Sequence, residues 1–252
     1  MRERMSDLRA VILAAGKGTR MKSELPKVVH TIDGKCLVDY AIDAATGAGA
    51  KEICLVVGYK SEVVKESICH KDVKFALQEE QLGTGHAVKC AKEFLGEEGE
   101  TLILFGDTPL ITAETLTRLL AFHKEKKNAV TVLSAMIDDP TGYGRIIRDT
   151  DGNFVKSVEH KDANEAELLF HEINSGMYIF DTKELSEALE KLTPDNAQGE
   201  YYLPDTLTII KEKGLRVDAF ALESPEDITG VNDKEQLAAA AEIIRKRINE
   251  KN

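Results

Sequence analysis

The chain has few cysteines, and none of them stands in a metal-binding or redox spacing. Its four cysteines are Cys36, Cys54, Cys69 and Cys90. They form no CxxC pair, and no paired Cys/His ligand motif accompanies them. This usage predicts free thiols in a reducing compartment, several of them packed as small hydrophobic side chains.

Positive charge is also in deficit. Lys and Arg total 33 against 44 for Asp and Glu, which gives a formal net charge of -11. A general nucleic-acid binder carries a basic face, so this balance argues against nucleic acid as a partner. An anionic ligand would need a local cluster of cations, or a metal ion, to overcome the overall field.

Long apolar runs are missing as well. The apolar run "AVILAA" that follows the charged start "MRERMSDLR" is far too short to cross a membrane. The start also lacks the layout of a signal peptide. We therefore expect a cytoplasmic protein with no membrane partner.

What the chain does have is enough hydrophobic residues, 42% of 252, for one large domain or a domain plus an appendage. In the first half, short apolar runs alternate with amphipathic ones. Strands are predicted at residues 9–15, 52–57, 73–78, 101–105 and 129–137, and helices at 38–49, 61–69, 85–95 and 113–127. Helices between continuously apolar strands indicate βαβ crossovers and a parallel sheet covered on both faces.

The second half changes character. Residues 144–160 read as a hairpin with Asp151-Gly152 at its turn. Further strands are predicted at 175–180 and 215–222, with helices at 182–192, 203–213 and from 234 onward. The predicted fold class is therefore α/β, a mixed and mostly parallel sheet flanked by helices. Antiparallel additions would wall one side of a cleft.

Three polar or small residues follow predicted strands. Gly16 follows the first strand, Gln78 ends the third, and Asp107 comes directly after "LILFG". Ligands of an open parallel sheet bind outside the carboxyl ends of its strands. We therefore expect these three residues to meet at one edge of the sheet.

The first of these loops, "AAGKGTRM", suits a polyphosphate although it fits neither familiar formula. GxxxxGK[ST] is absent, and Met21 stands where GxGxxG needs its third glycine. Gly16 and Gly18 allow the backbone to approach a ligand, and successive N–H groups can form an anion-binding concavity. Arg20 and Lys27 supply a planar guanidinium and a compact charge. A plain strand-to-helix turn with solvated cations is the alternative.

Other motifs carry two interpretations each. Asp107, in "FGDTPL", either caps a turn or ligates Mg²⁺. In "EEQLGTGHA", Thr84 between two glycines either reads a base edge or caps a helix, and His86 is taken as structural. Glu159 and Asn174 are of the type that reads sugar hydroxyls, and equally of the type found in turns.

Taken together, the motifs resemble a known family. "LAAGKGTRM", "LPK", "QLGTGHA", "GDTPL", "DPTGYGRI", "VEHKDA", "EINSGMY", "NAQGEYYLPD" and "GVND" occur in the order seen in bacterial N-acetylglucosamine-1-phosphate uridylyltransferases. The chain resembles the N-terminal pyrophosphorylase domain of the GlmU-type enzymes from about Leu8 to the final helix. The resemblance implies a Rossmann-like nucleotidyltransferase domain at residues 6–232 and a C-terminal helix at 233–252.

The resemblance also implies site residues in four groups. These are Arg20 and Lys27 on the phosphates as catalytic residues; Ala14, Ala15, Gly16, Gln78, Gly83 and Thr84 for the nucleotide; Gly144, Glu159 and Asn174 for the sugar; and Asp107 and Asn232 for Mg²⁺ as cofactor. The implied reaction joins UTP and N-acetylglucosamine 1-phosphate into UDP-N-acetylglucosamine, a peptidoglycan precursor, with release of pyrophosphate.

The chain departs from the family at two points. The hexapeptide repeats of the β-helix that performs acetyl transfer are absent, so we expect no acetyltransferase activity from this chain, and its oligomeric state stays open. Phe105 stands where a tyrosine is expected. Two alternatives remain: another sugar-1-phosphate nucleotidyltransferase, specific for glucose 1-phosphate or dTTP, and a non-catalytic nucleotide-sugar sensor.

Overall fold

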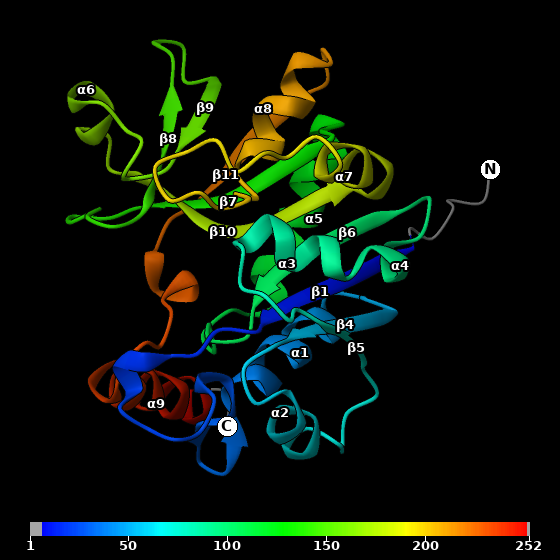
Figure 1. Cartoon of the computed structure of the whole chain (residues 1–252). Coiled ribbons are helices and arrows are strands. Elements are labelled where there is room, and N and C mark those ends of the chain that lie inside the picture. Colours follow the sequence, from blue (N-terminus) through cyan, green and yellow to red (C-terminus); the bar gives the residue numbers. More distant parts are fainter. Residues whose placement is uncertain (1–6, 251–252) are drawn as a thin grey trace.

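The structure, a computed structural model, describes residues 7–250 and is built on a nine-stranded sheet (Figure 1). Four strands of the first half are β1 (Leu8–Ala14), β4 (Glu52–Val57), β5 (Lys74–Leu77) and β6 (Glu100–Phe105). β1 pairs in parallel with β4 and β6, and β4 pairs in parallel with β5. The predicted parallel sheet is confirmed. Its inner strands are near-continuous apolar runs because both faces are covered.

The sheet becomes mixed where the second half of the chain joins it. The strands involved are β7 (Val130–Met136), β8 (Gly144–Arg148), β9 (Phe154–Val158), β10 (Glu172–Asp181) and β11 (Val217–Leu222). β10 lies between β6 and β7 and is antiparallel to both, and β11 pairs in parallel with β7. β8 pairs antiparallel with β9 and β10, so the predicted hairpin is confirmed.

Helices cover both faces of the sheet. One layer is α1 (Leu37–Gly47), α2 (Ser61–Ser67) and α5 (Ala113–Lys126); the other is α3 (Thr84–Cys90), α4 (Lys92–Leu95), α7 (Thr182–Leu189) and α8 (Asp205–Glu212). Alternate residues of β1 divide between the layers: Ala10 and Ile12 pack into the first core, and Val11 and Leu13 into the second. This period-2 division is the expected consequence of strand geometry.

A smaller apolar cluster holds the C-terminal helix α9 (Lys234–Asn249) against the two-stranded hairpin of β2 (Thr31–Ile32) and β3 (Lys35–Cys36). Ile32 and Ile244 are both buried in it. Asp233 caps the helix by accepting a hydrogen bond from the Gln236 N–H. Of the predicted division at residues 6–232 and 233–252, Ser6 and residues 251–252 lie outside the described residues.

Several short elements were not expected from the sequence. They are β2, β3, the single-turn helix α6 (Glu165–Leu168) and the 3₁₀ turns η1 (Thr19–Met21), η2 (Lys27–Val29) and η3 (Pro225–Ile228). Such elements are too short to show a hydrophobic period. The helix predicted at 85–95 is broken at Ala91 into α3 and α4, although no glycine or proline marks the break. Within residues 7–250, no helix is long and apolar enough to cross a membrane.

Candidate active site

A cavity of about 360 Å³ lies at the carboxyl ends of β1, β5 and β6. Gly16, Gln78 and Asp107 all line it, so the sequence-based expectation that they meet at one edge of the sheet is confirmed. Parallel strands with the same direction deliver their following loops to the same edge. The other lining residues are Leu13, Ala14, Ala15, Lys27, Val28, Gln81, Gly83, Thr84, Ala87, Phe105 and Glu200.

The opening loop is fixed by its backbone. The Ala15 carbonyl accepts hydrogen bonds from the Tyr59 N–H at 3.2 Å and from Gln81 Nε2 at 2.8 Å. Gly18 has a φ of +62°, and a Cβ there would lie 2.5 Å from the Cβ of Lys27. Only glycine fits both the left-handed backbone and this approach. The loop therefore lies directly against Lys27.

Lys27 brings together the two residues assigned to the metal. Its Nζ donates to the Asp107 carboxylate and, at 3.0 Å, to Asn232 Oδ1. The side chains of Lys27 and Asp107 are largely buried. The Asp107 carbonyl accepts from the Val231 N–H at 2.8 Å, which holds the segment around Asn232 beside the end of β6. Asn232 is not the cap of α9, because Asp233 has that role. The side-chain oxygen of Asn232 is therefore available for a cation.

The two oxygens fit a divalent cation. Carboxylate and amide oxygens already converge on one positive charge, the Lys27 ammonium. Mg²⁺ takes one or two carboxylates and completes its shell with water and substrate phosphates. No cluster of three or more His, Cys, Asp or Glu side chains that could hold a metal occurs in the described part of the chain. A metal at Asp107 and Asn232 would therefore depend on substrate phosphates for its remaining ligands.

Gln78, Gly83 and Thr84, at and before the start of α3, form another wall of this first cavity. Gln78 is 4% exposed, and its Nε2 donates to the Gly83 carbonyl at 3.2 Å. Gly83 has a φ of +108°, and a Cβ there would lie 2.6 Å from the Tyr201 carbonyl. The Thr84 hydroxyl does not cap the helix; it accepts a hydrogen bond from the Leu203 N–H at 3.2 Å. The 201–203 segment therefore fixes this wall.

A neighbouring cavity of about 170 Å³ shares Thr84 and Phe105 with the first. Gly144, Glu159 and Asn174 line it, as predicted for a sugar subsite. The pairing of β8 with β9 and β10 brings them together, and a Cβ on Gly144 would lie 3.1 Å from Glu159 Oε1. Whether they bind sugar stays a prediction.

Carboxylates concentrate at this end of the site. Burial raises the pKa of Glu159, and the negative charges of Asp205, Asp162 and Glu200 raise it further. Burial also raises the pKa of Asp205 to about 6. Both carboxyls therefore keep their protons to a higher pH than exposed Glu and Asp side chains do.

The side chain of Asn174 is held from three directions. Its Nδ2 donates to Ser157 Oγ at 3.0 Å and to the Tyr178 hydroxyl at 2.9 Å, while its Oδ1 accepts from the Gly176 N–H at 2.8 Å. Burial raises the pKa of Tyr178, so its hydroxyl stays protonated. Asn174 is therefore fixed in place before any ligand arrives.

One predicted residue stands apart, and others were missed. Arg20 lies in η1 with an exposed side chain and does not line either cavity. Gln81, Phe105 and Glu200 line the first cavity without having been assigned to it. Gln81 belongs to the same "EEQLGTGHA" stretch as Gln78, which is the signal that could have identified it.

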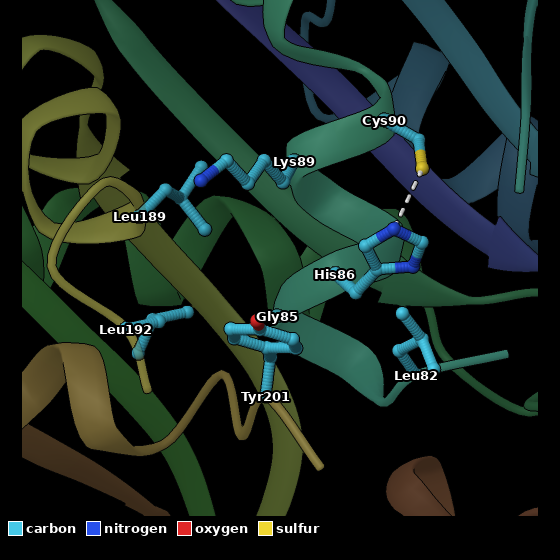
Figure 2. Close-up of a pocket in the computed structure, with 8 residues that line it drawn as sticks. All are labelled: Leu82, Gly85, His86, Lys89, Cys90, Leu189, Leu192 and Tyr201. Atoms are coloured by element: carbon cyan, nitrogen blue, oxygen red, sulfur yellow. Dashed lines mark hydrogen bonds between the residues drawn. The ribbon is translucent and has the colours of Figure 1, made fainter. Parts of the chain in front are cut away.

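A third cavity, of about 390 Å³, lies on another side of α3. Figure 2 shows His86, Lys89 and Cys90 of α3 facing it, together with apolar side chains. His86 Nε2 lies 3.9 Å from Cys90 Sγ, and the His86 and Tyr201 ring centroids are 6.3 Å apart. None of the residues predicted for catalysis, nucleotide, sugar or metal lines this cavity.

Lys27, Asp107 and Asn232 cluster beside the first cavity, at the carboxyl edge of an α/β sheet, which is where nucleotide-binding proteins of this class hold their ligands. The sequence model of the family described as nucleotidyl transferase matches residues 9–232, and the chain belongs to this family. A solved structure described as UDP-glucose pyrophosphorylase complexed with UDP-glucose has a similar fold. Its TM-score is 0.74 at 20% identity, over 96% of this chain and 100% of that one.

The curated relatives are more similar in sequence. The bifunctional protein GlmU of Caldanaerobacter subterraneus subsp. tengcongensis is 55% identical over 247 residues, which are 98% of this chain and 54% of that protein. The protein of the same name from Clostridioides difficile is 51% identical over 244 residues, covering 97% of this chain and 53% of that protein. The chain thus spans about half the length of the curated relatives it matches.

Proposed function

We propose that this chain transfers a uridylyl group from UTP to N-acetylglucosamine 1-phosphate, giving UDP-N-acetylglucosamine and pyrophosphate. The observation that carries the proposal is the pair of adjoining cavities that share Thr84 and Phe105, with the Lys27–Asp107–Asn232 cluster beside them. One cavity has the residues for a nucleotide and the other those for a sugar. Relatives named GlmU at 51–55% identity support the choice of substrates.

The reaction needs no general base. The sugar phosphate is a monoester with a second pKa of about 6, so it is largely a dianion at neutral pH. One of its oxygens attacks the α-phosphorus of UTP, the bond from that phosphorus to the β-phosphate oxygen breaks, and pyrophosphate leaves on the opposite side. The protein must bring two anions together in line, which makes positioning and charge neutralisation its main tasks.

Lys27 and Arg20 neutralise the charge of the phosphates. Lys27, in η2, lies at the cavity wall, and Arg20 lies on the opening loop, from which its exposed side chain can extend to the phosphates. Asp107 and Asn232 would hold Mg²⁺, which when bound supplies charge neutralisation across the phosphates.

Binding divides between the two cavities. Ala14, Ala15 and Gly16 would line the nucleotide, with Gln78, Gly83 and Thr84 at its base and ribose. Gly144, Glu159 and Asn174 would hold the sugar. In this proposal the transferase domain runs to residue 232, the rest is the C-terminal helix, and the setting is the cytoplasm. Neither nucleic acid nor membrane is a partner.

The test is pyrophosphate release by the full chain with Mg²⁺ and UTP, comparing N-acetylglucosamine 1-phosphate with glucose 1-phosphate. Replacing UTP by dTTP or CTP provides the nucleotide controls. Release that requires UTP and the N-acetylated sugar supports the proposal. Preference for glucose 1-phosphate or dTTP would assign a different nucleotidyltransferase specificity, and UTP binding without release would identify a sensor.

A further inference from the structure

The side-chain amide of Gln78 uses its nitrogen entirely inside the protein. Nε2 donates to the Gly83 carbonyl at 3.2 Å and contacts His86 Nδ1 at 3.1 Å. An amide nitrogen has two hydrogens, so both are occupied. No residue in the described range donates to Gln78 Oε1, and Gln78 lines the nucleotide cavity. The carbonyl oxygen is therefore the polar atom that Gln78 offers to a nucleotide base.

The Gly83 carbonyl and His86 Nδ1 together fix this orientation. If the amide were turned over, Oε1 would face the Gly83 carbonyl, and two acceptors would be left against each other. To accept from Gln78, His86 Nδ1 must be unprotonated, so a neutral imidazole carries its hydrogen on Nε2. That atom faces Cys90 Sγ, a weak acceptor, at 3.9 Å (Figure 2). The contact with Cys90 is compatible with the tautomer that the Gln78 contact requires.

We infer that His86 is a positioning residue that makes the site select uracil over cytosine, an inference that rests on the proposed nucleotide cavity. Uracil presents an N3–H donor beside a carbonyl at C4. Cytosine presents an N3 acceptor beside an amino donor. Gln78 Oε1 accepts from the uracil N3–H, whereas the cytosine N3 lone pair would oppose it.

The backbone N–H of Gly83 favours uracil as well. Its N–H has no acceptor among the described residues and lies in the same cavity wall. It can donate to the uracil carbonyl but would oppose the cytosine amino group. A site that hydrogen-bonds the donor and acceptor of one base rejects a base in which the two are reversed. The buried polar groups of the site are then left unpaired.

The selectivity acts through Gln78 and not through direct contact. His86 does not line the nucleotide cavity; it lines the third cavity, with Cys90 and Tyr201. Thymine has the same N3–H edge as uracil. His86 should therefore affect discrimination between UTP and CTP and leave discrimination between UTP and dTTP unchanged. A general loss of folding or packing would change the UTP:CTP and UTP:dTTP ratios alike.

The experiment compares His86→Leu with His86→Asn in the full chain. Leu removes the acceptor, while the Asn side-chain oxygen can occupy the position of Nδ1. Lys89→Gln, three residues further along α3 and lining the same third cavity, is the matched control. For each protein, kcat/KM is measured for UTP, CTP and dTTP, and UTP and CTP affinities are measured by calorimetry. Thermal melting confirms that each variant is folded.

We expect His86→Leu to lower the UTP:CTP ratio about tenfold or more, the size of one neutral hydrogen bond. Its UTP:dTTP ratio and its KM for the sugar phosphate should stay unchanged, and His86→Asn and Lys89→Gln should resemble the parent. An unchanged UTP:CTP ratio in His86→Leu, or an equal loss in His86→Asn, would overturn the inference. If the parent binds UTP over CTP but releases no pyrophosphate, the proposed function fails, and the affinity ratios still decide the role of His86.

Discussion

At the scale of single residues, Lys27 occupies the point where Asp107 and Asn232 converge. One ammonium satisfies two oxygen ligands that a divalent cation would also use. Two cations cannot share this point without strong repulsion in a largely buried site. If Asp107 and Asn232 hold a metal as proposed, the lysine would have to move away, and the phosphates of a bound nucleotide would give its charge a new partner.

Replacing Lys27 by Met should strengthen metal binding to the protein alone. With the ammonium removed, Asp107 and Asn232 are free, and Mn²⁺ affinity without nucleotide should rise about tenfold or more, since a nearby like charge is lost. Electron paramagnetic resonance of free Mn²⁺ measures this directly. Lys17→Met, on the same loop but over the Tyr59 ring, is the control and should bind Mn²⁺ like the parent. Equal or weaker binding by Lys27→Met would contradict the competition.

Replacing Asp107 by Ala should abolish most turnover while the chain stays folded. The variant loses the only carboxylate among the described residues that contacts Lys27. Turnover should fall by about a thousandfold or more, because neutralisation of phosphate charge contributes several kcal/mol to the transition state. Pyrophosphate release with saturating Mg²⁺ and circular dichroism are the measurements. Asp151→Ala, at the exposed hairpin turn, should stay near parent activity; near-normal turnover in Asp107→Ala would remove the metal assignment.

At the scale of elements, the irregularity of β10 shapes the wall between the cavities. Its pairing with β7 shifts register between Asn174 and Tyr178. Gly176, inside this bulge, has a φ of +78°, and a Cβ there would lie 2.4 Å from Cε2 of Phe105. The bulge therefore turns Asn174 toward the second, smaller cavity and places the Phe105 ring against bare backbone.

Two glycine substitutions separate backbone strain from packing. Gly214 has the same φ of +78° as Gly176, but a Cβ there meets nothing within 4 Å. Gly214→Ala should cost about 1–2 kcal/mol from strain alone. Gly176→Ala should cost about 1–3 kcal/mol more, because Phe105 must also move. Urea unfolding of both variants tests this, and equal losses would show that the contact with Phe105 is unimportant.

Most helices and strands could be predicted from the sequence, because the patterns that indicate them are local. Near-continuous apolar runs identified the parallel strands, and Asp151-Gly152 identified the hairpin turn. The insertion of β10 between β6 and β7 could not be predicted, because pairing order depends on tertiary packing and not on periodicity. The same holds for the contact of Lys27 with Asn232, which lies 205 residues away. Without the family resemblance, Asn232 would have been taken for a helix cap.

At the scale of the whole molecule, charge is unevenly placed along the two joined cavities. Lys27, Asp107 and Glu200 line the first cavity, while Glu159 lines the second, with Asp162 and Asp205 near it. Lys27 is the only cation among the described residues that line either cavity, so a phosphate that enters is attracted to that side chain. In the proposed reaction, Lys27 would therefore draw the phosphate of a sugar phosphate toward the first cavity, although the net charge of the chain is -11.

The acidic end makes stability depend on pH. Burial raises the pKa of Asp205 from 3.8 to about 6. Between these values the folded chain holds a proton that the unfolded chain has released, so this contribution to stability falls as pH rises and is lost above about 6. Asp205→Asn should therefore be more stable than the parent by about 1–2 kcal/mol at pH 7.5 and nearly equal at pH 4.5. Urea unfolding at pH 7.5 and pH 4.5 measures this, with the exposed Asp195→Asn as control. A stability difference between Asp205→Asn and the parent that is the same at both pH values would contradict the prediction.

The position of β10 has a consequence for the order in which the chain is made. β6 is complete at Phe105, yet its second neighbour ends at Asp181, so the growing sheet has an unpaired edge while the intervening segment is synthesised. An apolar strand with an open edge is a template for pairing with other chains. The same insertion that brings Asn174 to the second, smaller cavity thus leaves the nascent protein open to aggregation until the chain as far as Asp181 has left the ribosome.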